Sequence, residues 1–386
     1  MTPLKGSTSE GGPAVIKNRY IMIGGFLGAG KTTAVGRLAR RLSQQGLRVG
    51  LITNDQGRNL VDTALLRWQG FPTEEIPGGC FCCRFNSLVE AAQRLQARSQ
   101  PQVIIAEPVG SCTDLVATVT YPLRRLYGEN FTVAPVSVLV DPVRALRVLG
   151  LEPGGSFSEK VRYIYLKQLE EADLIVISKC DLLDAARLES LRAALAARFP
   201  HKDIVAVSPR MGTNLDAWFE KLAGAEQKAG QAMEVDYTVY AEGEALLGWL
   251  NGTAEVSATT AFDGNRLLEA LAEAIHARLR SAGSEVAHLK MTLIPAGELE
   301  RLAAVNLVRT DFMPELSMRL EQPVKEGRLI INLRAEAAPE ALAAAVREGV
   351  GAVASEFPTV KAALGPVEHF RPGKPTPTHR LGTVVA

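Results

Sequence analysis

Phosphate-binding chemistry is indicated by the stretch GGFLGAGKTT, which runs from Gly24 to Thr33. The part from Gly25 to Thr32 matches the pattern G-x-x-x-x-G-K-[ST] at every fixed position, and its glycines let backbone N–H groups turn toward phosphate oxygens. We expect Lys31 to contact the β- and γ-phosphates and the Thr32 hydroxyl to bind Mg²⁺. The predicted nucleotide-binding residues of this stretch are Gly25, Gly28, Ala29, Gly30, Lys31, Thr32 and Thr33.

A phosphate loop of this kind also needs a carboxylate at the end of a neighbouring strand, close to Mg²⁺ or its water shell. Glu107 ends the apolar run VIIAE, and Gly110 follows three residues later, where its N–H is expected to sense the γ-phosphate. Asp141, in LVDP, is a rival carboxylate. Because one of the two acids is expected merely to cap a helix, we favour Glu107 for the catalytic site.

The base of the nucleotide is predicted from VISKCD, which places Lys179 and Asp181 just after a strand. An aspartate can accept two hydrogen bonds from N1–H and the exocyclic amine of guanine, whereas adenine would leave it unpaired and desolvated. The Lys179 stem would lie on the base face, and Ser208 begins a loop expected over its far edge. These residues favour GTP over ATP, although an aspartate that only caps a helix is the simpler alternative.

Metal chemistry is indicated by GGCFCC, where Cys80, Cys82 and Cys83 lie within four positions. Thiolates bind Zn²⁺ and similar ions, and tetrahedral sites take four ligands. We expect two of the thiols to bind directly, with Asp55, Asp62, a second chain or water completing the shell. The remaining cysteines, at 112 and 180, are isolated in the sequence, so the site is expected to be incomplete, exposed and suited to transient metal holding. Packing cysteines and a redox-active thiol pair are the alternatives.

Strands and helices must position these residues. Over residues 19–222, short apolar runs alternate with amphipathic stretches, which predicts an α/β fold with a mainly parallel sheet. The runs are nearly continuous in hydrophobicity, as strands covered on both faces require. The predicted strands are 19–24, 48–53, 102–107, 134–141, 173–178 and 203–208, and the predicted helices include 32–45, 86–98 and 185–198.

The pattern of apolar residues changes after the first domain. Residues 223–234 lose their apolar spacing and are expected to form a linker. Residues 235–365 are predicted to form a smaller α+β domain, suited to a client or partner, with helices at 265–283 and 339–357 and with strands that include YTVYAEG at 237–243. Residues 1–18 are expected to be a flexible leader, and the Pro-rich residues 366–386 an extended tail.

Composition narrows the class of protein. The net charge of +1 gives no general attraction to nucleic acid or to a membrane surface. The longest apolar runs fall short of the roughly 18 residues that indicate a membrane span. Five cysteines, three of them clustered, fit thiol chemistry in a reducing compartment better than a disulfide framework. We therefore expect a cytoplasmic protein without a nucleic-acid or membrane partner.

The motifs GGFLGAGKTT, TNDQG, GGCFCC, E-x-x-G and SKCD occur in this order, and over about residues 19–222 the sequence resembles the CobW-type metallochaperone GTPases, relatives of UreG and HypB in the SIMIBI class of P-loop proteins. The resemblance implies a GTPase that couples hydrolysis to delivery of a metal, with a C-x-C-C metal motif and an E-x-x-G motif. Asn54-Asp55 stands where the family usually has Asn-Glu, so Asp55 is a candidate for contact with Mg²⁺ or the cargo. Ser178 replaces the commoner Asn of the guanine motif.

From this resemblance the sequence predicts a GTP-hydrolysing metallochaperone with slow intrinsic turnover, in which GTP orders the segment from Asp55 to Cys83 and hydrolysis releases the metal. The implied cofactors are GTP and Mg²⁺, and the cargo is Zn²⁺ or Co²⁺, with Ni²⁺ or Fe²⁺ as alternatives. The partner is a client metalloprotein or a cofactor-pathway protein, and a homodimer would supply missing ligands. The alternative function is a GTP-dependent switch that remodels a client, with thiols of structural use only. The expected metal-site residues are Cys80, Cys82, Cys83, Thr32, Asp55 and Glu107.

Overall fold

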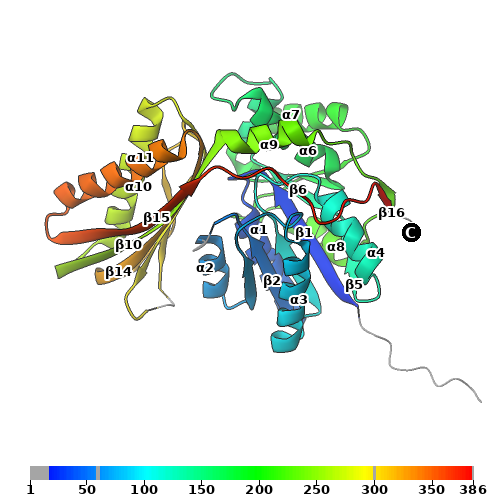
Figure 1. The fold of residues 1–386 in the computed structure, drawn as a ribbon, viewed down its shortest axis with the longest axis horizontal. Coiled ribbons are helices and arrows are strands. Elements are labelled where there is room, and N and C mark those ends of the chain that lie inside the picture. The colour runs from blue at the N-terminus through cyan, green and yellow to red at the C-terminus, as the bar shows by residue number, and fades with distance from the viewer. Residues whose placement is uncertain (1–16, 58–60, 299–300, 385–386) are drawn as a thin grey trace, which may run out of the picture.

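The first domain is built on a parallel sheet in a computed structural model that describes residues 17–57, 61–298 and 301–384. The expected leader, residues 1–18, lies almost entirely outside the described residues. Strand order is β3-β2-β4-β1-β6-β7-β8, with β5 paired to β1 (Figure 1). The strands are β1 (Asn18–Gly25), β2 (Val49–Asn54), β3 (Thr73–Ile76), β4 (Val103–Glu107), β5 (Phe131–Val133), β6 (Ser137–Val140), β7 (Leu174–Ile177) and β8 (Asp203–Ala206).

Helices cover both faces of this sheet, which explains the continuous hydrophobicity of its strands. Along β1, Ile21 and Ile23 belong to the core beneath α1 and α8, whereas Tyr20 and Met22 belong to the core beneath α3 and α6. The helical elements are α1 (Lys31–Gln44), α2 (Val61–Trp68), α3 (Phe85–Ser99), the π-turn η1 (Val116–Thr120), α4 (Tyr121–Tyr127), α5 (Pro142–Val148), α6 (Glu159–Glu171), the 3₁₀ turn η2 (Cys180–Leu182), α7 (Ala185–Arg198) and α8 (Leu215–Gly224).

The second domain is an antiparallel sheet of order β13-β12-β11-β14-β10-β15. The two amphipathic helices α10 (Gly264–Ser281) and α11 (Pro339–Glu356) lie on its outer face (Figure 1). Together with the parallel sheet, this confirms the predicted fold class, a P-loop α/β domain followed by an α+β domain. The strands are β10 (Leu247–Phe262), β11 (Glu285–Pro295), β12 (Ala303–Leu307), β13 (Glu315–Met318), β14 (Val324–Glu336) and β15 (Val360–Phe370).

The inner face of this second sheet is polar where it meets the first domain. On β14, Leu333 belongs to the core beneath the helices, whereas Asn332 and Arg334 hydrogen-bond to residues of the first domain. On β11, Leu289 lies in the same core, and Lys290 reaches across to the first domain. Since successive side chains on a strand point to opposite faces, the alternation places a row of polar side chains opposite the phosphate loop.

The prediction of a strand at 237–243 is wrong, because Tyr237–Leu246 forms the helix α9. The Asp236 carboxylate caps this helix by accepting from the N–H groups of Thr238 (2.8 Å) and Val239 (3.2 Å). Tyr240 is fully buried against the first domain. A cap and tertiary burial therefore outweigh the strand preference of the aromatic and β-branched residues.

The expected tail begins inside regular structure, since β15 continues past residue 365 to Phe370. The chain then returns along the first domain to β16 (Thr383–Val384), which pairs with β9 (Gly230–Gln231) near α4 (Figure 1). The predicted linker thus contains the partner strand of the tail. Within the described residues, no helix combines the length and apolarity needed to cross a bilayer.

Candidate functional site

The phosphate loop joins β1 to α1 and places Lys31 in the interior. A side chain at Gly25 (φ 128°) would clash with the Leu139 carbonyl on the neighbouring strand, so the loop requires glycine there. The Lys31 ammonium donates to the Gly25 carbonyl at 2.9 Å. Burial lowers the pKa of Lys31, and the Glu107 carboxylate acts in the opposite direction.

The Thr32 hydroxyl lies between two carboxylates. Its oxygen is 2.6 Å from Asp62 Oδ1 and 2.9 Å from Glu107 Oε1. The other Glu107 oxygen is buried and has no hydrogen-bond partner among the described residues. Burial, and then the Asp62 charge, raises the pKa of Glu107 to about 7. The structure therefore places Glu107 where the sequence predicts it, at the end of β4 beside Thr32.

The second domain contributes a cation to this cluster. The Lys290 ammonium lies 2.6 and 2.8 Å from the two Asp62 oxygens. Although burial favours the neutral acid, Lys290 and hydrogen bonds to it hold the pKa of Asp62 below its usual value. Lys290 was not predicted. The signal that could have found it is the polar alternation on β11, where His288, Lys290 and Thr292 stand between apolar core residues.

Asp55, a candidate for contact with Mg²⁺ or the cargo metal, forms an ion pair with the second domain. Its carboxylate pairs with the Arg334 guanidinium at 2.9 and 3.2 Å and accepts from the Gly57 N–H at 2.9 Å. Arg334 is fully buried and also donates to the Leu250 carbonyl at 2.7 Å. The structure thus puts Asp62 against Thr32, and uses Asp55 to join the two domains.

Of the predicted base-binding residues, Lys179 contacts the phosphate loop. Lys179 has a left-handed backbone (φ 50°), and its ammonium donates to the Gly28 carbonyl at 2.7 Å and to Asp141 at 2.9 Å. Asp181 is exposed in the following turn. Ser208 is buried, and its hydroxyl accepts from the Met211 N–H at 3.2 Å.

Asp141, the rival of Glu107, caps a helix. It accepts from the Arg144 N–H at 3.1 Å at the start of α5 and pairs with Arg309 of the second domain at 2.9 Å. Although burial favours the neutral acid, Lys179 and Arg309 hold the pKa of Asp141 well below its usual range. The contacts of Asp141 are therefore those of a structural carboxylate.

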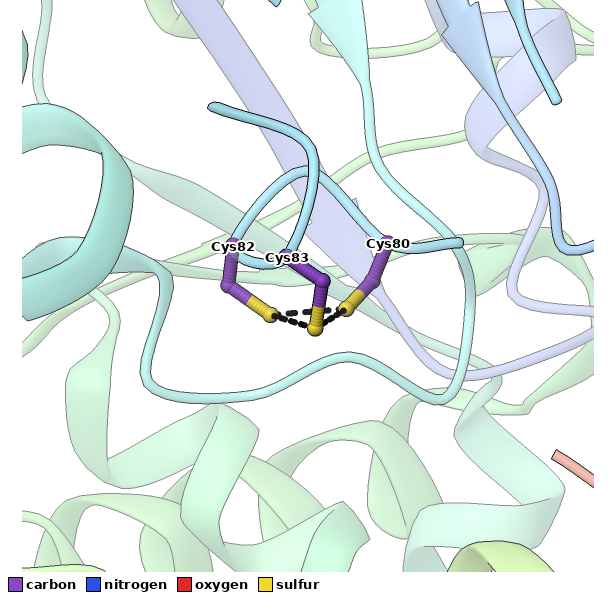
Figure 2. A group of neighbouring side chains, drawn as sticks. All are labelled: Cys80, Cys82 and Cys83. Carbon is purple, nitrogen blue, oxygen red and sulfur yellow. Dashed lines mark hydrogen bonds between the residues drawn. The ribbon is translucent and has the colours of Figure 1, made fainter. Parts of the chain in front are cut away.

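The three clustered cysteines point toward one another on the turn before α3 (Figure 2). The Sγ–Sγ distances are 2.7 Å between Cys80 and Cys82, 3.2 Å between Cys80 and Cys83, and 3.6 Å between Cys82 and Cys83. All three sulfurs converge, because the chain folds back within one turn. The expectation of an exposed site is wrong for two of the thiols, because Cys80 is 4% and Cys82 1% exposed, whereas Cys83 is partly exposed.

Cys112 is isolated in the sequence but packs in the same buried core as the cluster. It follows the end of β4, is 1% exposed, and belongs to the same buried core cluster as Cys80 and Cys82. Hydrogen bonds from Cys112 and then from the other thiols lower the pKa of Cys80. Cys180 lies apart in η2, within the guanine motif between Lys179 and Asp181.

The returning tail covers the cluster. The Thr376 N–H donates to Cys83 Sγ at 3.2 Å, and the Thr378 N–H donates to the Cys82 carbonyl at 2.9 Å. The Arg380 guanidinium pairs with the buried Asp114 at 2.8 Å. These contacts make residues 376–380 a strap across the thiols, which nothing in the local sequence indicates.

Comparison with known proteins gives a match between residues 19–206 and the family model described as CobW/HypB/UreG, nucleotide-binding domain. The zinc chaperone CobW of Sinorhizobium sp is 32% identical over 205 residues, which is 47% of this chain and 56% of that protein. The zinc chaperone YeiR of Escherichia coli (strain K12) is 30% identical over 166 residues, 42% of this chain and 47% of that protein. The chain spans about half the length of the curated relatives it matches.

Among solved structures, the hydrogenase maturation factor HypB from Archaeoglobus fulgidus is similar with a TM-score of 0.38 and 22% identity. That match covers 54% of this chain and 90% of that chain. The family predicted from the motifs is confirmed for residues 19–206.

Proposed function

Because residues 19–206 form a CobW/HypB/UreG nucleotide-binding domain, we propose that the protein is a GTP-hydrolysing metallochaperone. It binds a transition metal, Zn²⁺ or Co²⁺, through Cys80, Cys82 and Cys83 and delivers it to a client metalloprotein. GTP hydrolysis is the release step. Two relatives are named zinc chaperones, which supports Zn²⁺ as the first cargo to test.

The residues around Thr32 fit Mg²⁺. The Thr32 hydroxyl, Asp62 and Glu107 offer only oxygen donors, which is the set this hard cation prefers, and Glu107 has a buried oxygen without a partner among the described residues. These groups would hold Mg²⁺, which supplies neutralisation of charge on the β- and γ-phosphates. Lys31 adds a second cation at the phosphates, and Asp181 reads the guanine edge.

The observation that carries the proposal is the convergence of three sulfurs in the domain that also holds the phosphate loop. Their Sγ atoms all lie within 4.8 Å of one another, which is the spacing that several ligands of one ion require. A thiol-rich site selects soft or borderline cations over Mg²⁺. One domain therefore offers separate sites for a hard and for a borderline cation.

The proposal is tested with reduced, Zn²⁺-loaded full-length protein. Phosphate release and Zn²⁺ transfer to a chromogenic chelator are measured with Mg²⁺ and GTP, GDP or a non-hydrolysable GTP analogue. We expect slow hydrolysis, retention of Zn²⁺ with the analogue and faster transfer after hydrolysis. Cys82→Ser should bind less Zn²⁺, whereas Cys180→Ser, outside the cluster, should bind as much as the wild type. Equal Zn²⁺ retention in all nucleotide states contradicts the proposal.

One observation favours the second candidate, a nucleotide-gated switch with structural thiols. Cys80 and Cys82 are almost completely covered, as packing cysteines would be. For this function, wild-type protein would bind no Zn²⁺, and in Cys82→Ser the nucleotide would still change hydrogen exchange in β11 and β14. The metallochaperone function instead predicts that the wild-type protein binds Zn²⁺ and that Cys82→Ser binds less of it.

A further inference from the structure

Lys290 brings a cation of the second domain to the phosphate site. Its ammonium donates to both oxygens of Asp62, at 2.6 and 2.8 Å, and the Thr32 hydroxyl donates to Asp62 Oδ1 at 2.6 Å. Because the two donors share one carboxylate oxygen, the Lys290 nitrogen is at most two hydrogen-bond lengths from the Thr32 oxygen. Lys290 therefore lies beside the residue that is expected to bind Mg²⁺ next to the β- and γ-phosphates.

The register of the second sheet fixes this position. Lys290 on β11 stands opposite Asn332 on β14. The Asn332 side-chain oxygen accepts from the Val61 N–H at 2.9 Å, and Val61 begins α2, one residue before Asp62. Two neighbouring side chains of the sheet therefore hold two consecutive residues of the first domain. Lys290 thus reaches Asp62 from an ordered strand, which positions a side chain more precisely than a loop does.

The strand that carries Lys290 also packs against the phosphate loop. A Cβ at Gly28, which has a φ of 79°, would lie 2.9 Å from the Ala287 carbonyl oxygen. The Arg144 guanidinium donates to the carbonyls of Val286 (3.3 Å) and Ala287 (3.4 Å). Since these contacts fix the start of β11 to the first domain, we expect the Lys290 backbone to keep its place when a nucleotide binds. Only the flexible lysine side chain then has to move.

Two buried polar side chains on the same face of β11 have no partner. His288 and Thr292 stand two residues before and after Lys290, and therefore share its face of the sheet. They are 5% and 0% exposed, and the two His288 ring nitrogens and the Thr292 hydroxyl have no hydrogen-bond partner among the described residues. Because buried polar groups are normally hydrogen-bonded, this face is suited to a polar ligand held between the domains.

We propose that Lys290 is a catalytic residue contributed by the second domain, and that its ammonium turns from Asp62 to the γ-phosphate of bound GTP. The inference rests on the proposed function, because it takes GTP as the substrate. Within the described residues both hydrogen bonds of Lys290 go to Asp62, although an ammonium has three donors. The Lys290 side chain is 17% exposed, so it is not locked in the interior. Asp62 then remains for the Mg²⁺ site with Thr32 and Glu107.

The Lys290 ammonium stabilises the charge that develops on the γ-phosphate during hydrolysis. The water oxygen bonds to the γ-phosphorus while the bond from this phosphorus to the β–γ bridging oxygen breaks, and the electron pair leaves with GDP. One water proton stays on the released phosphate and the other passes to solvent, so Lys290 keeps its own proton. An arginine finger supplied in cis has this role in other phosphate-loop enzymes.

The test compares full-length wild type with Lys290→Met. Phosphate release is measured with Mg²⁺ and GTP, and calorimetry measures binding of Mg²⁺-bound GDP with and without aluminium fluoride, which mimics the transferring phosphoryl group. Lys290→Met should release phosphate about 10- to 100-fold more slowly and lose a similar factor in affinity for GDP with aluminium fluoride. Its affinity for GDP alone should stay close to that of the wild type. Lys325→Ala, an exposed lysine of the same domain, is the matched control and should equal the wild type throughout.

Three outcomes overturn the inference. If Lys290→Met binds GDP with aluminium fluoride as tightly as the wild type, Lys290 does not contact the γ-phosphate. If it loses the same affinity for GDP with and without aluminium fluoride, Lys290 only positions Asp62. In both cases GTP hydrolysis by the wild type leaves the proposed function standing, whereas a wild type that releases no phosphate from GTP overturns both. Lys290→Gln, which is also uncharged, takes the place of Lys290→Met if that variant does not fold.

Discussion

The carboxylates on the two sides of the Glu107–Cys112 segment differ in how burial is compensated. At the phosphate site, Asp62 faces Lys290 at 2.6 Å and Asp141 faces Lys179 at 2.9 Å. These cations hold the pKa values of both acids below their usual values, although burial acts the other way. Asp62 and Asp141 therefore stay ionised, whereas burial, and then the Asp62 charge, raises the pKa of Glu107 at the same site to about 7.

On the thiol side the acids are buried beside neutral donors. Glu171 accepts from the Thr113 hydroxyl at 3.2 Å and from the Val116 N–H at 3.1 Å, and burial raises its pKa to about 8. Burial, and then the charge of Cys80, raises the pKa of Glu244 well above its usual value. The difference teaches that paired cations keep Asp62 and Asp141 charged, whereas burial beside neutral donors favours the protonated forms of Glu171 and Glu244.

The largest effect on nucleotide binding should come from Lys31→Ala. Loss of the ammonium removes charge-assisted phosphate contacts, so affinity for Mg²⁺-bound GDP should fall by about 100-fold or more, measured by calorimetry. Lys325→Ala, an exposed lysine on β14, should leave the affinity unchanged. Cobalt binding by the thiols without nucleotide should survive Lys31→Ala. Loss of cobalt binding in this variant would mean that the two sites are not electrostatically separate.

The next effect concerns the charges that join the domains. Arg334→Met leaves the Asp55 carboxylate without its cation and removes one donor from the Leu250 carbonyl. Breaking a buried pair of this kind should lower the free energy of unfolding by about 3–5 kcal/mol, measured in urea. Arg278→Met, which breaks the exposed pair with Glu348, should cost under about 1 kcal/mol. Similar losses in both variants would refute the buried role of Arg334.

Glu171→Gln tests, through the pH dependence of the free energy of unfolding, whether Glu171 is protonated in the folded protein. The folded-state pKa of about 8 lies above the usual 4.5, so the folded protein binds more protons between these values. Stability from this group is complete below the lower pKa and is lost as pH rises through the upper one. Between pH 6 and 8 the wild type should lose about 2 kcal/mol of unfolding free energy relative to Glu171→Gln. Glu170→Gln, an exposed neighbour, should follow the wild type, and equal slopes in all three proteins would contradict the assignment.

The smallest effect should come from deleting the chain from Pro372 onward. The deletion removes the Thr376 and Thr378 donors from Cys83 and Cys82, so alkylation of Cys83 should accelerate several-fold, followed by peptide mass spectrometry. The gain is modest because the Thr376 N–H also stabilises the Cys83 thiolate. Cys112 should stay protected as an internal control. An unchanged rate at Cys83 would show that the strap does not limit access.

The phosphate loop could be predicted from the sequence because all its parts lie within one strand–loop–helix unit. The same is true of the C-x-C-C turn and of the parallel strands, whose hydrophobicity is continuous along the chain. The contacts of Asp62 with Lys290 and of Thr376 with Cys83 could not be predicted, since each joins separate segments through the tertiary fold. The helix at 237–246 escaped prediction because its cap and its burial against the first domain outweigh residue preference.

The strap across the thiols also has a consequence for protein synthesis. Residues 376–380 follow the whole second domain in the chain, so the ribosome makes them after residues 247–370. Roughly 290 residues separate Cys83 from Thr376, and at about 5–20 residues per second their synthesis takes roughly 15–60 s. During that interval the nascent thiol turn lacks its cover. The order of the segments therefore leaves the cluster uncovered while the rest of the chain is made, and the strap covers it only at the end of synthesis.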